Sequence, residues 1–315
     1  MTPKIQLPHF DDFLLNLQTN NYSSETVYSY ERDLEVFQNF LSDCGYKFES
    51  LDKKALLNYK AYLVSRDRKT PKSKQAKGKL VSFSVNKMLS ALRSYLRFLI
   101  DIDYRVPVAP NAVVLIKTEK KHLRVSEFNE VIQLIESPTL FEKDKKIALR
   151  NRAILETLFS TGLRISELIN LKTNQIDNTG RIFVRGKGKK ERFAYLTPRA
   201  GKHIKEYLKI RGESRSAFLF IPYRGKNSGS QDKKISPNYL ESKVKQYRER
   251  LALAIPITVH GIRHAFATYM VENGANPAAL QILLGHESLD TTTRYVHGSD
   301  RYAEKSFKRF HPLNN

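Results

Sequence analysis

Four residues that could carry out chemistry lie near the C-terminal end of the sequence: His260, Arg263, His286 and Tyr295. The guanidinium of Arg263 is a fork of donors that matches the oxygens of a phosphodiester. A tyrosine hydroxyl has a pKa near ~10, so its ionisation at neutral pH costs roughly 4 kcal/mol, which a base or a cationic cluster must offset. His260 and His286 are the candidates for that task. These residue types favour phosphoryl transfer without a metal.

Short helices and tight turns must position these residues. His260 and Arg263 are three residues apart, so on a helix both side chains project from one face. We expect that helix to end at Gly274 and a second one to span residues 277–285, starting at a proline and ending at a glycine. The following segment is rich in Ser, Asp and Thr, which predicts a loop before another helical turn that carries Tyr295.

A second arginine, Arg164, follows Gly162, which stands just ahead of another expected helix. We expect Arg164 in the first turn of that helix. The helix dipole disfavours a cation there, so Arg164 needs a partner or a function. Glu167, three residues later, can brace it. Taken alone, this pattern favours a surface arginine paired with Glu167.

Residues 181–196 have the pattern of a β-hairpin, with two apolar strands around a turn made of Gly and Lys. The turn is not a nucleotide-binding P-loop, because no Ser or Thr follows the lysine and the spacing differs. A lysine at a hairpin tip can instead reach into a DNA groove. Lys187 is the candidate and Lys189 its competitor, and a plain surface hairpin is the alternative.

Two further histidines are better explained by structure than by chemistry. His260 and His264 are four residues apart, a spacing that can bind a metal. Arg263 between them repels a cation, and no acidic ligand stands near in the sequence, so we expect no metal site. His264 is expected to pack or hydrogen-bond on its helix, and His297 to be structural.

The composition favours a polyanionic partner. Lys and Arg exceed Asp and Glu by 54 − 32 = 22 in 315 residues, and nucleic acid is the commonest partner of so basic a chain. No run approaches the ~20 apolar residues of a membrane span, and no signal-peptide pattern opens the chain. The single cysteine, Cys44, excludes an internal disulfide and a cysteine zinc site. We therefore expect a cytoplasmic protein that does not contact the membrane.

The pattern predicts two domains joined by a linker. Residues 1–106 read as a helical bundle, with helices after Ser23 and over residues 53–64 and 84–100. Residues 67–79 form a lysine-rich loop, interpreted as a mobile, solvated insertion or as a phosphate contact. Prolines make residues 107–122 an extended linker. Residues 123–315 open with helices near 126–135 and 145–159, which with the hairpin gives a mainly α, α+β fold.

Five motifs stand in an order that resembles the signature of the tyrosine recombinase (phage integrase) family. They are Thr161-Gly162-Leu163-Arg164-Ile165-Ser166-Glu167-Leu168, Gly186-Lys187-Gly188, His260-Gly261-Ile262-Arg263-His264, Gly285-His286 and Thr291-Thr292-Thr293-Arg294-Tyr295. The likeness is greatest to the Xer recombinases of bacteria and archaea and covers nearly the whole chain. It includes the N-terminal pattern of Thr26, Tyr30, Asp33, Leu34 and Phe37. One motif alone is weak, but five in order are specific.

The resemblance implies a role for each matching position. Arg164 and Arg263 match the phosphate-clamping arginines, and Lys187 the hairpin lysine that protonates the leaving oxygen. His260 matches the general acid/base, and Glu167 a supporting acidic residue. His286 matches the second histidine, which hydrogen-bonds the scissile phosphate, and Tyr295 the nucleophile that forms a 3′-phosphotyrosyl intermediate. No metal, ATP or other cofactor is implied.

The resemblance also implies the fold and the partners. The first domain would be a SAM-like, core-binding DNA-binding domain and the second the catalytic domain. Its C-terminal tail would dock into a neighbouring protomer, giving a homo-tetramer, or a hetero-tetramer with a second recombinase, on two DNA duplexes. A DNA translocase is a further possible partner. Residues 67–79 are longer than usual for Xer proteins, which leaves the DNA contacts of the first domain open.

Several functions remain open beside Xer-like resolution of chromosome or plasmid dimers. Integration and excision of a mobile element use the same chemistry. A type IB topoisomerase shares it too, but acts as a monomer and relaxes supercoils. A non-catalytic DNA-binding protein is disfavoured, because every expected catalytic residue type is present. The DNA target is not readable from the sequence, since base readout depends on groove positions.

Overall fold

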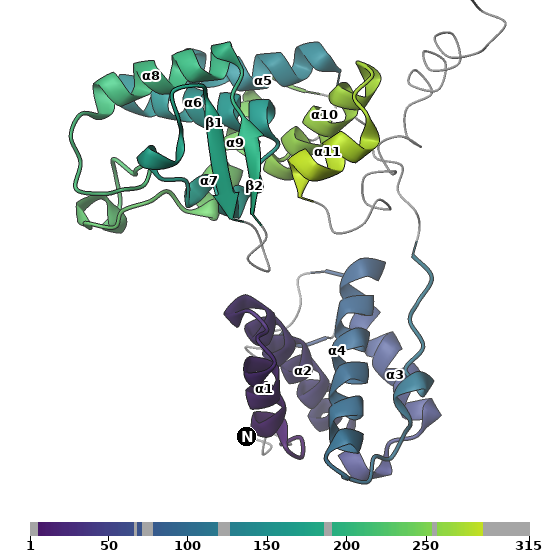
Figure 1. The fold of residues 1–315 in the computed structure, drawn as a ribbon. Helices are drawn as coiled ribbons and strands as arrows, with labels where there is room; N and C mark the ends of the chain where they lie inside the picture. The colour runs from purple at the N-terminus through teal and green to yellow at the C-terminus, as the bar shows by residue number, and fades with distance from the viewer. Residues whose placement is uncertain are drawn as a thin grey trace, which may run out of the picture. The chain divides into compact units, whose positions relative to one another are not determined.

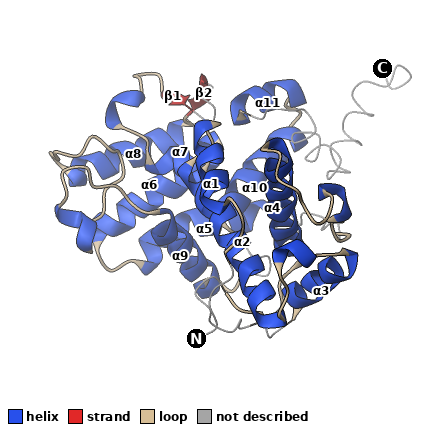
Figure 2. Ribbon diagram, turned by 90° about the horizontal axis from the view of Figure 1, so that it is seen from below, coloured by secondary structure: helices blue, strands red, loops and turns tan. Residues whose placement is uncertain are grey.

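The structure, a computed structural model, describes residues 6–65, 68–70, 78–118, 127–185, 191–253 and 257–285. The chain divides into two compact units, residues 1–121 and residues 122–315. Helices dominate both units, and one two-stranded sheet is the only sheet in the described ranges (Figures 1 and 2). The expected mainly α fold with a small antiparallel hairpin is confirmed. No helix in these ranges is long and apolar enough to span a membrane.

The N-terminal unit is built from α1 (Phe10–Thr19), α2 (Ser24–Cys44), α3 (Lys53–Val64) and α4 (Ser82–Asp101). The hydroxyl of Ser23 caps α2 by accepting a hydrogen bond from the Thr26 N–H at 3.2 Å. The carboxylate of Asp52 caps α3 in the same way. Such caps satisfy amide donors that have no partner inside the helix. The predicted start of α2 and both predicted ends of α3 are confirmed.

Aromatic side chains fill the core of this unit. Phe37 of α2 is fully buried, and its ring lies 4.8 Å from that of Tyr59 on α3. Phe13 of α1 packs edge-on against Tyr95 of α4 at 5.5 Å. Burying an aromatic side chain of this size stabilises the fold by about 1.5–3 kcal/mol. Each helix therefore contributes at least one ring to the same core.

Part of the basic loop is anchored rather than solvated. Arg68 is only 7% exposed. The side chain of Asn39 donates to the carbonyl of Thr70 at 3.0 Å, and the backbone N–H of Lys69 donates to the Tyr62 hydroxyl at 2.9 Å. The interpretation of residues 67–79 as wholly solvated is therefore wrong for residues 68–70. Polar groups on α2 and α3 bind their backbone, which composition alone does not reveal.

The segment after α4 lies along that helix. The side-chain amide of Asn86 donates to the carbonyl of Ile116 at 2.9 Å and accepts from its N–H at 2.8 Å. Val113 is fully buried, and Arg93 donates to its carbonyl. Residues up to 116 of the segment expected as a linker, 107–122, thus pack as part of the N-terminal unit.

The second unit is organised around one buried helix. Its elements are α5 (Phe128–Phe141), α6 (Lys145–Thr161), α7 (Ile165–Ile169), β1 (Arg181–Arg185), β2 (Glu191–Tyr195), α8 (Pro198–Arg211), α9 (Pro237–Arg250), α10 (Val259–Glu272) and α11 (Pro277–Leu284). Most residues of α6 are buried, and α5, α8 and α10 pack around it (Figure 1). The C-terminal end of α6 therefore has a fixed place inside the unit.

Both strands of the predicted hairpin are present. β1 and β2 pair antiparallel, with Phe183 opposite Phe193. Alternate residues of both strands face inward, as half-buried strands require. On the outer face the Phe183 and Phe193 rings lie 5.7 Å apart, and the Arg181 guanidinium lies 4.6 Å from the Phe193 ring centre. Residues 186–190 at the tip lie outside the described ranges.

Candidate active site

Arg164 and Glu167 are held together at the start of α7. α6 ends at Gly162, which adopts the left-handed conformation with φ +61°. Arg164 is the N-cap of α7, so the expectation that it lies within the first turn is wrong by one position. Glu167 accepts the Arg164 backbone N–H at 2.8 Å and its guanidinium at 3.0 Å. The predicted pairing is confirmed, and the carboxylate also offsets the unfavourable end of the helix dipole.

Glu167 stays ionised although its side chain is only 5% exposed. Burial alone would raise its pKa. The hydrogen bonds and charge of Arg192, together with those of Arg164, outweigh burial and hold the pKa of Glu167 below its usual value. The carboxylate is therefore a fixed anion between two arginines.

Arg263 lies on α10 and is only 2% exposed. Thr258 caps this helix by accepting the Gly261 N–H at 2.9 Å. One terminal nitrogen of Arg263 donates to the carbonyl of Gly162, and the other donates to the carbonyl of Leu284 at 2.9 Å. The planar fork of this guanidinium thus joins the end of α6 to the end of α11.

Three arginines converge on the last carbonyls of α11. Arg192 donates from Nε to Leu283 at 2.9 Å, Arg263 to Leu284, and Arg164 to Gly285 at 3.0 Å. The carbonyls at a helix C-terminus lack partners inside the helix and carry the negative end of its dipole. Cations are therefore favoured at this helix end. The predicted cap of α11 at Gly285 is confirmed.

His260 occupies the first turn of α10, beside this cluster. Partial burial lowers its pKa from the usual histidine value, and the positive charges of Arg263 and Arg164 lower it further. His260 is therefore neutral near pH 7 and able to accept a proton. The ring of His264 meets it edge-on, with centres 4.3 Å apart. Burial, with His260 and Arg263, lowers the pKa of His264 to about 4.

The structure thus brings Arg164, Arg263 and His260 together from two helices that are far apart in the sequence. Three other predicted residues, Lys187, His286 and Tyr295, lie outside the described residues and stay predictions, as do Lys189 and His297. Within the ranges that are described, no three His, Cys, Asp or Glu side chains are grouped as metal ligands.

Sequence reasoning missed Arg192. This residue lies on β2, and its guanidinium contacts both oxygens of Glu167 at 2.8 Å. A signal was present in the sequence, because Arg192 is two residues before Ala194 on a strand that alternates inward and outward. A charged residue at an inward position implies a buried partner. The partner itself could not be identified without the tertiary structure.

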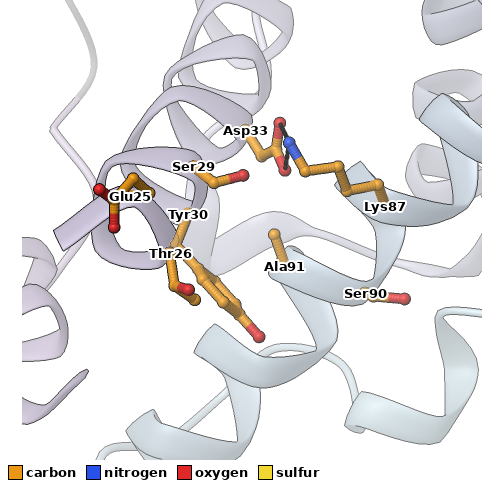
Figure 3. A pocket seen from close by; sticks show the side chains of 8 residues that line it. All are labelled: Glu25, Thr26, Ser29, Tyr30, Asp33, Lys87, Ser90 and Ala91. Carbon is orange, nitrogen blue, oxygen red and sulfur yellow. Dashed lines mark hydrogen bonds and ion pairs between the residues drawn. The ribbon is translucent and has the colours of Figure 1, made fainter. Parts of the chain in front are cut away.

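A separate hollow of about 320 Å³ lies in the N-terminal unit between α2 and α4. Figure 3 shows Asp33 of α2 and Lys87 of α4 facing each other across it, 3.3 Å apart. Glu25, Tyr30, Ala91 and three short hydroxyl side chains complete the lining: Thr26, Ser29 and Ser90. Its charged groups are the carboxylates of Glu25 and Asp33 and the amine of Lys87, so acidic groups outnumber basic ones. It offers hydrogen bonds rather than a phosphate clamp.

Comparisons with known proteins agree over nearly the whole chain. Residues 121–301 match the phage integrase family, and residues 10–102 match the phage integrase N-terminal SAM-like domain. The chain is 36% identical to tyrosine recombinase XerC of Pelobacter propionicus, over 95% of this chain and 94% of that one. It is 30% identical to tyrosine recombinase XerD of Staphylococcus epidermidis, over 92% and 93%.

A solved structure shares the fold. The XerH site-specific recombinase bound to a palindromic difH substrate, in a post-cleavage complex, aligns with a TM-score of 0.70. The alignment covers 98% of this chain and 91% of that one at 19% identity. This likeness supports the fold alone.

Proposed function

The chain belongs to the tyrosine recombinase (phage integrase) family, whose members cut and rejoin DNA, and on that premise we propose how its own residues carry out the reaction. Tyr295 attacks a DNA phosphate in line and displaces a 5′-hydroxyl. Its oxygen stays bound to the 3′-phosphate, so the energy of the phosphodiester is kept in a covalent intermediate. Attack by a 5′-hydroxyl of another duplex rejoins the DNA and exchanges strands. Two such rounds pass through a Holliday junction.

The convergence of Arg164 and Arg263 beside His260 is the observation that supports this proposal most. Negative charge develops on the non-bridging oxygens during the attack, and donors already held in place stabilise it by several kcal/mol, roughly 3–4 for one donor. Arg164 and Arg263 are our candidates for these donors, with His286 as a third. Their own contacts to Glu167 and to helix-end carbonyls limit how far they can move.

Proton transfer completes the assignment. We assign His260 as the base that takes the proton of Tyr295, because its lowered pKa keeps the ring in the neutral form that a base requires. Lys187 gives a proton to the leaving 5′-oxygen. Glu167 supports Arg164 and does not touch the phosphate. The assignment includes no ATP, because the covalent intermediate conserves the bond energy, and no metal, because the arginines are assigned to stabilise the developing charge.

Double-stranded DNA is the proposed substrate, held by both units. The surplus of 22 positive charges supports a polyanionic partner. We propose that the N-terminal unit also contacts DNA, because residues 10–102 match the phage integrase N-terminal SAM-like domain. Strand exchange needs two duplexes, so the active species is a tetramer, either of this chain alone or with a second recombinase.

The biological role we propose is resolution of chromosome or plasmid dimers. The names of the relatives at 36% and 30% identity, XerC and XerD, support this role over integration of a mobile element. The activity requires access to DNA, and we place the protein in the cytoplasm, where a septal DNA translocase is a possible activating partner.

Covalent capture tests the proposal. The chain and its Tyr295→Phe variant are incubated with fragmented host DNA and denatured, and the DNA that stays attached is sequenced. The parent protein should yield adducts at a single chromosomal or plasmid site, whereas Tyr295→Phe should bind DNA and yield none. Adducts that persist in Tyr295→Phe would disprove the nucleophile. Adducts at the ends of a mobile element would identify an integrase.

A sulfur substitution tests Lys187. When the leaving 5′-oxygen is replaced by sulfur, the thiolate leaves without a proton. Lys187→Ala should therefore cleave this DNA at a rate near that of the parent while failing on the normal linkage. Lys189→Ala is the matched control. Rescue of Lys189→Ala instead would show that Lys189 is the acid.

A further inference from the structure

Arg192 is a buried cation, and each of its three guanidinium nitrogens donates to an oxygen of the protein. Its side chain is 6% exposed. Both terminal nitrogens donate to Glu167, to Oε1 and to Oε2 at 2.8 Å each, and Nε donates to the carbonyl of Leu283 at 2.9 Å. This one side chain therefore connects β2, α7 and the end of α11.

Packing does not require a charge at this place. Replacing a buried ion pair by apolar side chains of similar volume is often neutral or stabilising, because the desolvation of both ions is then avoided. The ion pair between Arg192 and Glu167 is thus poorly explained by stability. Its geometry suggests that it orients other groups.

The first such group is Arg164. The Glu167 carboxylate accepts two hydrogen bonds from Arg192, one from the guanidinium of Arg164 and one from the Arg164 backbone N–H. With Arg192 in place, neither oxygen can turn without losing a bond to one arginine. Without it, the carboxylate could rotate towards Arg164 and pull that guanidinium away from its position.

The second group is the end of α11. A Cβ on Gly285 would lie 3.0 Å from Cδ of Arg192, so the aliphatic part of Arg192 lies directly against this cap. The bond from Nε to Leu283 fixes the preceding turn. The next residue in the sequence is His286, and β2 directly follows the hairpin tip that carries Lys187.

We propose that Arg192 is a positioning residue of the recombination reaction, which acts through Glu167 on Arg164 and through Leu283 on the end of α11. It does not touch the DNA. The inference rests on the proposed function, since it assigns Arg164 to the scissile phosphate. Arg192 thereby links the hairpin to the arginine clamp.

The test compares adduct formation by Arg192→Met and Arg192→Lys on two synthetic nicked duplexes that carry the captured sequence. One has the normal scissile phosphate. In the other, a methylphosphonate replaces a non-bridging oxygen and removes the negative charge that Arg164 would neutralise. Arg181→Met is the control, because Arg181 lies on the neighbouring strand with its side chain 50% exposed and pairs with Asp177 at 3.1 Å.

On the normal phosphate, Arg192→Met should form adducts about 10²-fold more slowly than the parent, the loss that a small misplacement of catalytic groups can cause. On the methylphosphonate it should approach the parent, because the guanidinium that it misplaces is no longer needed. Arg181→Met should match the parent on both duplexes. DNA binding and thermal unfolding are measured alongside, to separate misplacement from loss of the fold.

Three results with Arg192→Met would overturn the inference. They are an unchanged rate on both duplexes, an equal loss on both, and a loss that only follows unfolding. Arg192→Lys covers the case in which Arg192→Met does not fold, because lysine keeps the charge but cannot form the fork. It should show the same difference between the two duplexes, and parental rates on both would also overturn the inference. No adduct with the parent would instead refute the proposed function.

Discussion

A long helix in each unit ends at a left-handed glycine, but the two glycines differ in the groups that pack around them. Gly45 ends α2 and Gly162 ends α6, both in the left-handed conformation. A Cβ at Gly45 would meet nothing within 4 Å, whereas one at Gly162 would lie 2.5 Å from the ring of Phe266. The carbonyl of Gly162 also accepts a hydrogen bond from Arg263. A helix end becomes part of a site through the groups that pack on it, not through its own cap.

The two units also differ in how many charged side chains they bury. The core of the N-terminal unit is aromatic, and the buried charged residues among its described part are Asp33 and Arg68. The second unit buries more of them: Arg150, Arg152, Glu156, Arg192 and Arg263. Burying an ion costs several kcal/mol unless it is paired, roughly 3–5 when one partner of a pair is removed. At the candidate site, hydrogen bonds to Glu167 and to the carbonyl of Leu284 compensate the buried charges of Arg192 and Arg263.

The largest effect is expected from Arg263→Met. It removes a donor from the candidate site and leaves the carbonyls of Gly162 and Leu284 without this partner. We expect the rate of adduct formation to fall by about 10²–10³. The control is Arg152→Met, because Arg152 is also buried but pairs with Glu156 at 2.9 Å. It should lower the stability and leave the rate of the folded protein unchanged. Equal losses of rate would show that burial alone, and not the site, distinguishes these arginines.

Gly162→Ala and Gly45→Ala should separate the two helix ends. Both place a side chain in the left-handed region, at a cost of roughly 1–2 kcal/mol. At Gly162 the methyl group must also displace Phe266, which adds about 1–3 kcal/mol of overpacking. Thermal unfolding measures the difference. Gly162→Ala should also slow adduct formation, because it moves the carbonyl that binds Arg263, and a rate equal to that of Gly45→Ala would contradict this view.

Acid should act in opposite directions on one partly buried group in each unit. The folded-state pKa of His264 is lowered from 6.5 to about 4, so the unfolded chain binds the proton more readily. Its contribution to stability is complete above pH 6.5 and is lost as the pH falls towards about 4. Burial raises the pKa of Asp33 against the opposing charge of Lys87, so protonation of Asp33 favours the folded N-terminal unit.

Hydrogen exchange followed by mass spectrometry, corrected for the intrinsic effect of pH, measures each unit separately. His264→Gln should reduce the acid-induced loss of protection in the second unit. Asp33→Asn should remove the corresponding gain in the N-terminal unit. If both units lose protection alike and neither variant changes the profile, other groups control the response to acid.

Local signals explain what the sequence predicts correctly. The cap at Ser23, both ends of α3, the strands of the hairpin and the glycine that ends α11 each depend on a few neighbouring residues. The sequence predicts Glu167 as a partner of Arg164 because it is only three residues away. The contacts that join distant segments were not predictable. Arg192 bonds to Leu283 across 91 positions, and Arg263 to Gly162 across 101.

The smallest effect is expected from removing one helix cap in each unit, and it gives the most specific comparison. Ser23 caps α2 and Thr258 caps α10, each through one hydroxyl that accepts an N–H three residues later. Removing either hydroxyl, in Ser23→Ala or Thr258→Ala, should cost about 1 kcal/mol of stability. The two variants should nevertheless differ in the rate of adduct formation.

The first turn of α10 carries His260, so fraying of that turn would move the proposed base. Fraying of α2 would move no group assigned to proton transfer. Single-turnover adduct formation at saturating protein measures this without a contribution from binding. A slower rate in Thr258→Ala alone supports the assignment of His260, and equal rates with equal losses of stability would argue that His260 is not positioned by the first turn of its helix.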